Sequence, residues 1–187
     1  ASEMFSQQID WSIVDVFWSD ERCVPPDHPD SNYRMALDTL LTFVPIPASN
    51  IYRIPAELSP AGAAASYAKT LHTEFVDVPR MDLLFLGMGD DGHTASLFPG
   101  TSALNEYDRW VVANYVEKLA SWRITWTAAA TNAAARIAFL VAGKEKSQRL
   151  HEVLRGAYDP QNLPSQLIKP ENGELLWLID EAAATAL

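Results

Sequence analysis

The chain has 187 residues, 48% of them hydrophobic and 20% charged, which suits one α/β domain with a hydrophobic core and excludes a disordered or fibrous protein. The net charge of −10 makes nucleic acid and anionic membranes poor partners, and no apolar run is long enough to span a bilayer. Residues 1–8 lack the pattern of a secretory signal, and the single cysteine, Cys23, favours a reducing compartment such as the cytoplasm.

Short apolar runs alternate with longer amphipathic ones, which predicts alternating strands and helices. Residues 82–88 are almost continuously apolar, as is typical of a strand in a parallel sheet covered on both faces. Ser59 and Pro60 indicate the beginning of a helix, since serine caps helices and proline suits the first turn. In chain order, the pattern predicts strands over 13–18, 51–54, 82–88, 110–116, 123–126, 137–142 and 175–179, and helices over 32–43, 59–75, 128–135, 144–155 and 180–186.

This alternation predicts a layered α/β fold, with a mostly parallel β-sheet flanked by helices and a single domain over 1–187. In such sheets ligands bind beyond the carboxyl ends of the strands. Two polar segments follow apolar strands and are therefore candidate sites. One is the expected loop over 19–31, in which Asp20, Glu21 and Arg22 follow Ser19, and the other is the glycine-rich loop over 89–93.

The loop over 89–93 carries a histidine between residues that can position it. Gly89 and Gly92 allow backbone conformations closed to other residues and let a ligand approach closely. A neutral His93 imidazole could take a proton from water and return it to a leaving group. Asp90 or Asp91 would then fix its tautomer or orient a substrate hydroxyl. The alternative is a tight turn without a function.

An anionic substrate needs a local cluster of cations to overcome the overall negative charge. Arg22, Arg123 and Lys144 are the candidates, although each could also be ordinary surface charge. No zinc site is expected, because no two histidines have ligand spacing and Cys23 stands alone. Residues 87–92 fit the G-x-G-x-x-G pattern, but their aspartates would repel a dinucleotide pyrophosphate.

Three motifs resemble the 6-phosphogluconolactonase family, and they occur in the family's order over almost the whole chain. The related glucosamine-6-phosphate isomerases usually carry Asp-Glu-Tyr in the first motif, where this chain has Asp-Glu-Arg. The motifs are 18–25 with 30–33 downstream, 87–100, and 123–127 with Asn132, Ala133 and 139–144.

The resemblance implies a Rossmann-like fold of the 6-phosphogluconolactonase type. It also implies hydrolysis of 6-phospho-D-glucono-1,5-lactone to 6-phosphogluconate in the oxidative pentose phosphate pathway, without a metal or organic cofactor. On this reading His93 is the general base, Asp20 orients the substrate or water, and Arg22 stabilises negative charge or binds the substrate. Arg123 and Lys144 match phosphate-binding positions, and the remaining positions assigned to substrate binding are Gly89, Asp91 and Gly92.

The chain departs from the family at its beginning. Members of the family start with a further strand, a helix and a Gly-Gly-Ser-Thr-Pro-like loop that helps bind phosphate, and no such segment is found here. We therefore expect an N-terminally incomplete domain. Two alternatives stay open, a glucosamine-6-phosphate isomerase/deaminase and a non-catalytic sugar-phosphate sensor. The sequence does not distinguish a monomer from a homodimer.

Overall fold

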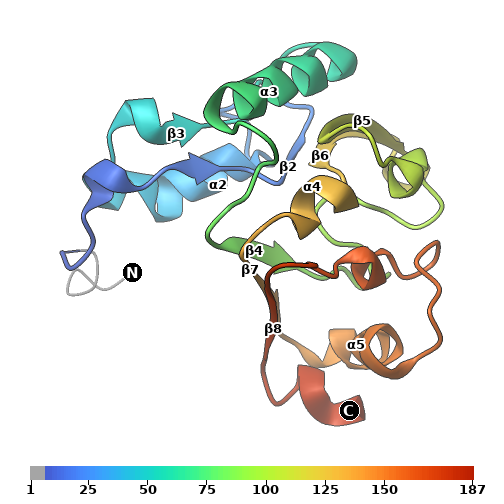
Figure 1. Cartoon of the computed structure of the whole chain (residues 1–187). Coiled ribbons are helices and arrows are strands. Elements are labelled where there is room, and N and C mark those ends of the chain that lie inside the picture. The colour runs from blue at the N-terminus through green and yellow to red at the C-terminus, as the bar shows by residue number, and fades with distance from the viewer. Residues whose placement is uncertain (1–6) are drawn as a thin grey trace.

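The computed structural model describes residues 7–187 and groups their strands into three small sheets (Figure 1). Residues 1–6, the beginning of the segment tested for a secretory signal, lie outside the described part. Two sheets are parallel, β1 (Val16–Phe17) with β3 (Ile51–Tyr52), and β4 (Leu84–Gly87) with β7 (Arg136–Val141) and β8 (Glu174–Ile179). The third is antiparallel, in the order β2 (Asp20–Arg22), β6 (Ser121–Trp126) and β5 (Val111–Val116).

The layered α/β fold with parallel sheets is thus confirmed, and the antiparallel sheet is an addition to it. A short 3-10 turn, Glu117–Leu119, connects β5 to β6 as a hairpin. Ala120 closes this turn with a φ of 46°, a left-handed conformation that non-glycine residues seldom adopt. Because the connection is so short, the two strands are antiparallel neighbours.

Most of the predicted helices form, with shifted ends. Ser59 caps α3 by accepting a hydrogen bond from the Gly62 amide, as expected. Two predictions need correction. Of the strand expected over 13–18 only Val16–Phe17 forms, since Ile13 ends a 3-10 turn over 11–13 that Asp10 caps. The expected last helix is only a 3-10 turn, Ala183–Ala186. None of the described helices is both long and apolar enough to cross a membrane. The α-helices are α2 (Asn32–Thr39), α3 (Pro60–Glu74), α4 (Ala128–Asn132) and α5 (Ser147–Arg155).

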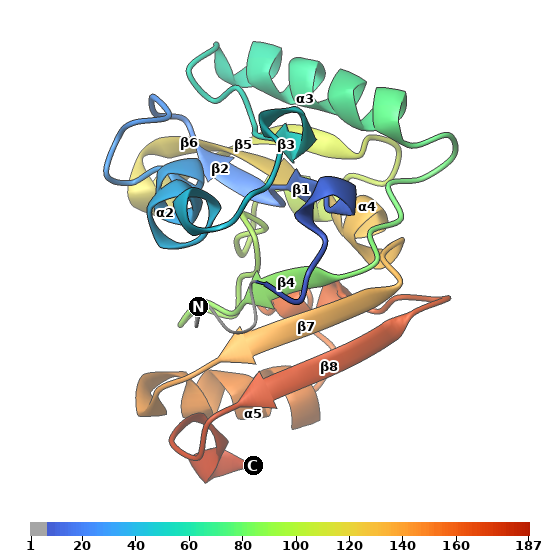
Figure 2. The same ribbon diagram turned by 90° about the vertical axis from the view of Figure 1, so that its left-hand side faces the viewer.

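Two hydrophobic cores support the sheets. The first lies under β4, β7 and β8, where Ile137 and Phe139 pack with Leu150 of α5. The second lies between α3 and the antiparallel sheet, where Tyr67 packs with Trp126. Figure 2 shows the arrangement, with β4, β7 and β8 side by side and the strands of the second core beyond β4.

The parallel sheet is covered on one face only within the described residues, which corrects the prediction of a sheet buried on both faces. Along β4, buried Leu84 and Leu86 alternate with exposed Phe85, which is 58% accessible. Leu140 and Leu178 are each 52% accessible on β7 and β8. In Figure 2, α5 lies behind this sheet and the other face points toward the viewer. The apolar composition of residues 82–88 therefore does not report burial directly.

Candidate active site

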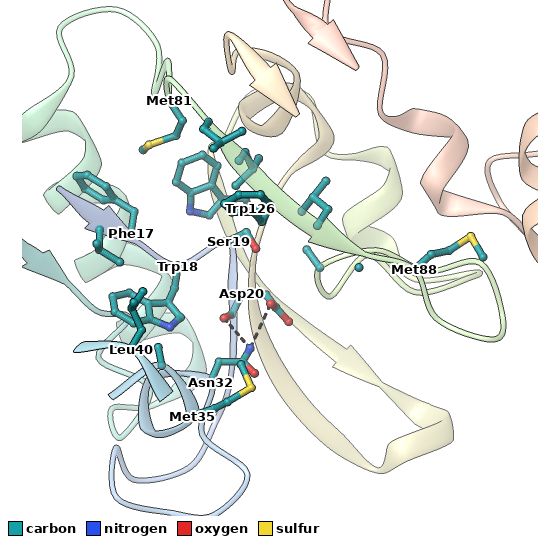
Figure 3. Close-up of a pocket in the computed structure, with 18 of the residues that line it drawn as sticks. Phe17, Trp18, Ser19, Asp20, Asn32, Met35, Leu40, Met81, Met88 and Trp126 are labelled. Atoms are coloured by element: carbon teal, nitrogen blue, oxygen red, sulfur yellow. Dashed lines mark hydrogen bonds between the residues drawn. The ribbon is translucent and has the colours of Figure 1, made fainter. Parts of the chain in front are cut away.

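A cavity of about 740 Å³ opens between the β1 segment, α2 and β4, and it holds several of the predicted site residues (Figure 3). Its walls are largely apolar, with Trp18, Met88 and Trp126 among them. Its polar lining includes Asp20, Asn32, Arg22, His93 and Lys146. A volume of this size is typical of small-molecule sites.

Asp20 and Arg22 lie on strand β2, although the sequence predicts a loop there. The strand pairs with β6 so that Asp20 is opposite Thr125 and Arg22 is opposite Arg123. Because alternate residues of a strand point to the same side, Asp20 and Arg22 share one face and Glu21 faces the other. The two residues assigned to chemistry therefore reach the cavity together.

The buried carboxylate of Glu21 explains why so polar a strand is stable. Glu21 is 2% accessible, and its oxygens accept hydrogen bonds from the backbone amides of Arg22, Asn32 and Tyr33. The Ser31 hydroxyl donates a further bond of 3.0 Å. Asn32 and Tyr33 begin α2, so an anionic group here also suits the positive end of the helix dipole. Glu21 thus joins β2 to α2.

Asp20 is held by groups from two other elements. Ser96 Oγ donates to Asp20 Oδ2 at 2.6 Å, and Asn32 Nδ2 donates to Asp20 Oδ1 at 3.2 Å. Figure 3 shows the Asn32 amide placed between the Asp20 carboxylate and the Asp20 carbonyl oxygen. Burial raises the pKa of Asp20, while the Ser96 hydrogen bond and the charge of Arg22 partly oppose the rise.

The glycine-rich loop after β4 closes on itself and presents His93. The Gly89 amide donates to the His93 carbonyl at 2.8 Å, and Gly92 has a φ of 81°. A side chain on Gly89 would collide with the imidazole ring, so glycine is needed for this close approach. The loop geometry expected of Gly89 and Gly92 is therefore present.

The His93 ring is oriented by two neighbours. His93 Nδ1 lies 2.6 Å from Asp91 Oδ1, and the ring stacks on Phe98 with centroids 4.0 Å apart. Because a carboxylate can only accept, Nδ1 carries the proton and Nε2 is left as the basic nitrogen. No described residue forms a hydrogen bond with Nε2. Of the two aspartates proposed to fix the tautomer, Asp91 is the one in contact.

Burial alone would raise the pKa of Asp91, but its hydrogen bonds from His93 and Lys118 bring the net pKa below its ordinary value. Asp91 is therefore a carboxylate, consistent with its role as acceptor. Neither Asp91 nor Gly92 lines the cavity, in contrast to their assignment as substrate-binding residues. Asp91 instead lies behind His93 and orients it.

The structure separates the predicted cations. Arg22 lines the cavity, and Arg123 lies beside it in the β2–β6 pairing, with its guanidinium donating to Ser121 Oγ. Burial and the nearby charge of Arg22 lower the pKa of Arg123. Lys144 is exposed and lies outside the lining, whereas Lys146 enters it and donates to the Met88 carbonyl at 2.7 Å. The cation after β7 that reaches the cavity is thus Lys146.

Sequence reasoning missed three residues that complete the site, Ser96, Phe98 and Lys146. Ser96 and Phe98 lie in the motif over 87–100, but nothing in their spacing shows that one would bind Asp20 and the other would stack on His93. Lys146 is two residues from the predicted Lys144. Gly143, with a φ of 101°, directly precedes the 3-10 turn Lys144–Lys146, whose last residue enters the cavity lining.

Known proteins resemble this chain over nearly its whole length. A 6-phosphogluconolactonase of Nostoc sp. is 45% identical over 97% of this chain and 77% of its own length. A probable chloroplastic 6-phosphogluconolactonase 3 of Oryza sativa is 40% identical over 98% of this chain. The chain spans 60% of the length of that rice relative.

Solved structures of known proteins share the fold of this chain. The devB protein has a TM-score of 0.93 and 32% identity, covering 100% of this chain and 79% of its own. The 6-phosphogluconolactonase of Thermotoga maritima has a TM-score of 0.82 and 29% identity, covering 95% and 78%. A monomeric glucosamine-6-phosphate deaminase shares the fold, with a TM-score of 0.83 at 16% identity, covering 98% and 79%.

A family model described as glucosamine-6-phosphate isomerases/6-phosphogluconolactonase matches residues 1–177. This match covers all the residues that line the cavity, including the Asp20 and His93 segments. The chain therefore belongs to the family of glucosamine-6-phosphate isomerases and 6-phosphogluconolactonases.

Proposed function

We propose that this protein hydrolyses 6-phospho-D-glucono-1,5-lactone to 6-phosphogluconate, the lactonase step of the oxidative pentose phosphate pathway. The observation that carries the proposal is the Asp91–His93 pair, which presents a basic nitrogen in a cavity that also holds Arg22 and Lys146. The names of the Nostoc and Thermotoga maritima relatives support this substrate over an amino sugar.

In the proposed reaction, His93 Nε2 takes a proton from water as the water oxygen bonds to the lactone carbonyl carbon. The carbonyl electrons move onto oxygen and form a tetrahedral intermediate. When it collapses, the bond from that carbon to the ring oxygen breaks, and the imidazolium returns its proton to the ring oxygen. Positioned proton transfer of this kind contributes about 10²–10⁴-fold to the rate.

The other residues of the cavity supply charge and orientation. Arg22 and Lys146 stabilise the negative charge of the intermediate or bind the phosphate, and Arg123 adds to the positive potential beside Arg22. Lys146 takes the role that the sequence assigns to Lys144, because it lines the cavity. Asp20, fixed by Ser96, orients the substrate or the attacking water.

The test is the variant His93→Ala, assayed for lactone hydrolysis with the spontaneous rate subtracted. We expect kcat to fall about 10²–10⁴-fold, because only the proton transfer is removed. The matched control is His151→Ala on α5, which should keep full activity since His151 is outside the cavity lining. Binding of 6-phosphogluconate, measured by calorimetry, should survive in both variants.

Three results would contradict the proposal. An unchanged kcat in His93→Ala would remove the imidazole from the reaction. Turnover of glucosamine 6-phosphate by the wild type, in place of the lactone, would assign the isomerase/deaminase activity. Binding of 6-phosphogluconate without any acceleration of lactone hydrolysis would indicate a sensor.

We further propose that the protein works in the cytoplasm. The support is Cys23, the one cysteine of the chain, which is free. A lone thiol suits a reducing compartment. The rice relative described above is named as chloroplastic, so fractionation of the source cells, followed by detection with an antibody, is the direct test.

A further inference from the structure

The residue that the proposed mechanism leaves unused, yet which contacts its central pair, is Lys118. It lies in the turn Glu117–Leu119 between β5 and β6, far along the chain from the His93 loop. Its ammonium group donates to Asp91 Oδ2 at 3.2 Å, while Asp91 Oδ1 accepts from His93 Nδ1 at 2.6 Å. One carboxylate therefore connects a cation of the hairpin to the imidazole.

We propose that Lys118 is a positioning residue for His93, which acts through Asp91 to fix the carboxylate and to set the protonation of the imidazole. This role rests on the proposed function, in which His93 is the general base. Lys118 does not line the cavity, and its side chain is 64% accessible, so it does not contact the substrate.

The geometry assigns Lys118 two effects. First, the carboxylate of Asp91 is held at both oxygens, so Oδ1 stays directed at His93 Nδ1 and the ring keeps Nε2 unprotonated toward the cavity. Second, the ammonium charge neutralises part of the field that Asp91 exerts on His93. An isolated carboxylate would stabilise the imidazolium, so a smaller fraction of His93 would be the free base near neutral pH.

The other charges around the pair do not replace Lys118. Asp20 on β2 interacts with His93 through its charge, and it has the same sign as Asp91. Arg149 of α5 binds the Asp90 carbonyl and pairs with Glu152, while Lys146 binds the Met88 carbonyl. The remaining charged groups nearby are Asp90 on the same loop, Arg22 on β2 and Glu117 beside Lys118. Among the described residues, only Lys118 forms an ion pair with Asp91 apart from His93.

The experiment measures the His93 pKa by NMR titration of its Cε1–H signal in Lys118→Met, Lys118→Arg and Lys118→Glu. Loss of the ammonium charge should raise the His93 pKa by about half a pH unit, and a reversed charge by about one unit. Lys118→Arg should leave it unchanged. Lys69→Met, an exposed lysine on α3, is the matched control and should give no shift.

The pH profile of lactone hydrolysis should shift together with the His93 pKa. The acid limb of kcat/KM should shift upward by the same amount in Lys118→Met and Lys118→Glu, because more of the base is protonated at a given pH. Equal His93 pKa values in Lys118→Met and Lys69→Met would overturn the proposal. A fall of kcat in Lys118→Met without any shift of the His93 pKa would also overturn it.

The titration does not depend on turnover. If the wild type fails to hydrolyse the lactone, the proposed function fails, and the NMR shift still decides the role of Lys118. Circular dichroism of each variant shows that the fold is intact before the titration is read.

Discussion

Asp20 combines a charged group with surroundings that disfavour the charge. Its carboxylate is held by Ser96 and Asn32, and burial raises its pKa. The proposed reaction needs the Asp20 carboxylate in the cavity lining, whereas folding favours its neutral form. Function and stability therefore make opposite demands on one side chain.

The first prediction concerns Asp20→Asn. Because the folded pKa of Asp20 is raised, its protonated form stabilises the fold below the unfolded value of 3.8, and that contribution is lost as the pH rises through the folded pKa. Asparagine stays neutral, so the variant should have the higher Tm at pH 8 and the same Tm as wild type at pH 4. Its kcat should fall by at least about tenfold, since the fixed anion is gone.

Calorimetric melting curves across this pH range check the prediction, together with the lactone assay. Asp27→Asn, which changes an exposed carboxylate outside the cavity lining, serves as the control and should show no such dependence. A variant less stable than wild type at pH 8 would mean that the Asp20 charge supports the fold.

The His93 loop shows which contacts of a site can be predicted from the sequence and which cannot. Glycines beside a histidine and two aspartates predict a presented imidazole, and the structure provides the contact to Asp91. The distinction between Asp90 and Asp91, like that between Lys144 and Lys146, depends on backbone turns of a few residues. Local sequence does not determine the backbone conformation of these turns, since it follows from packing against distant segments.

At the level of elements, strand β2 is the part that sequence patterns could not predict. Asp20, Glu21 and Arg22 contain no apolar residue, so nothing in them signals a strand. The strand forms because β6 pairs with it and because the amides at the beginning of α2 satisfy Glu21. By contrast, α3 is predictable because its cap and its first-turn proline are local signals.

The second prediction is that Glu21→Gln destabilises the protein. A glutamine amide in place of one oxygen would face a backbone N–H donor, which leaves a buried donor unpaired. We expect the free energy of unfolding to fall by about 1–3 kcal/mol. Urea denaturation followed by circular dichroism measures the change.

Glu117→Gln, on the exposed hairpin turn, is the control for removing a carboxylate and should change stability little. If Glu21→Gln unfolds at the same urea concentration as wild type, the four hydrogen bonds at Glu21 contribute little net stability. The lactonase activity should also decrease in Glu21→Gln. Glu21 binds the backbone amide of Asn32, and the Asn32 side chain in turn donates a hydrogen bond to Asp20.

For the whole molecule, one feature of the described surface is the apolar face of β4, β7 and β8 that lies opposite α5. Phe85, Leu140, Leu176 and Leu178 expose apolar side chains on neighbouring strands. Contiguous apolar patches of this kind associate with other apolar surfaces. The third prediction is that the double variant Leu140→Lys/Leu178→Lys keeps the wild-type Tm, because neither side chain is buried in the core.

The same variant should bind less of a hydrophobic dye and scatter less light at high concentration. Introduction of two lysines elsewhere, at Ser66→Lys and Thr73→Lys on the exposed side of α3, tests whether any added charge has this effect. A large drop in Tm for the double variant would show that the face packs against something in the folded protein.

The site draws its groups from both cores: Asp20 and Arg22 stand on the antiparallel sheet, while His93 and Lys146 follow strands of the parallel one. The hydrogen bond from Ser96 to Asp20 bridges the two sides. Activity therefore depends on how the two cores are placed relative to each other. A small displacement between them would separate Asp20 from His93 and abolish activity, while each core kept its own structure. Inactivation would then come before unfolding. Loss of lactonase activity would therefore report a change in the folded protein earlier than the circular dichroism signal of its secondary structure.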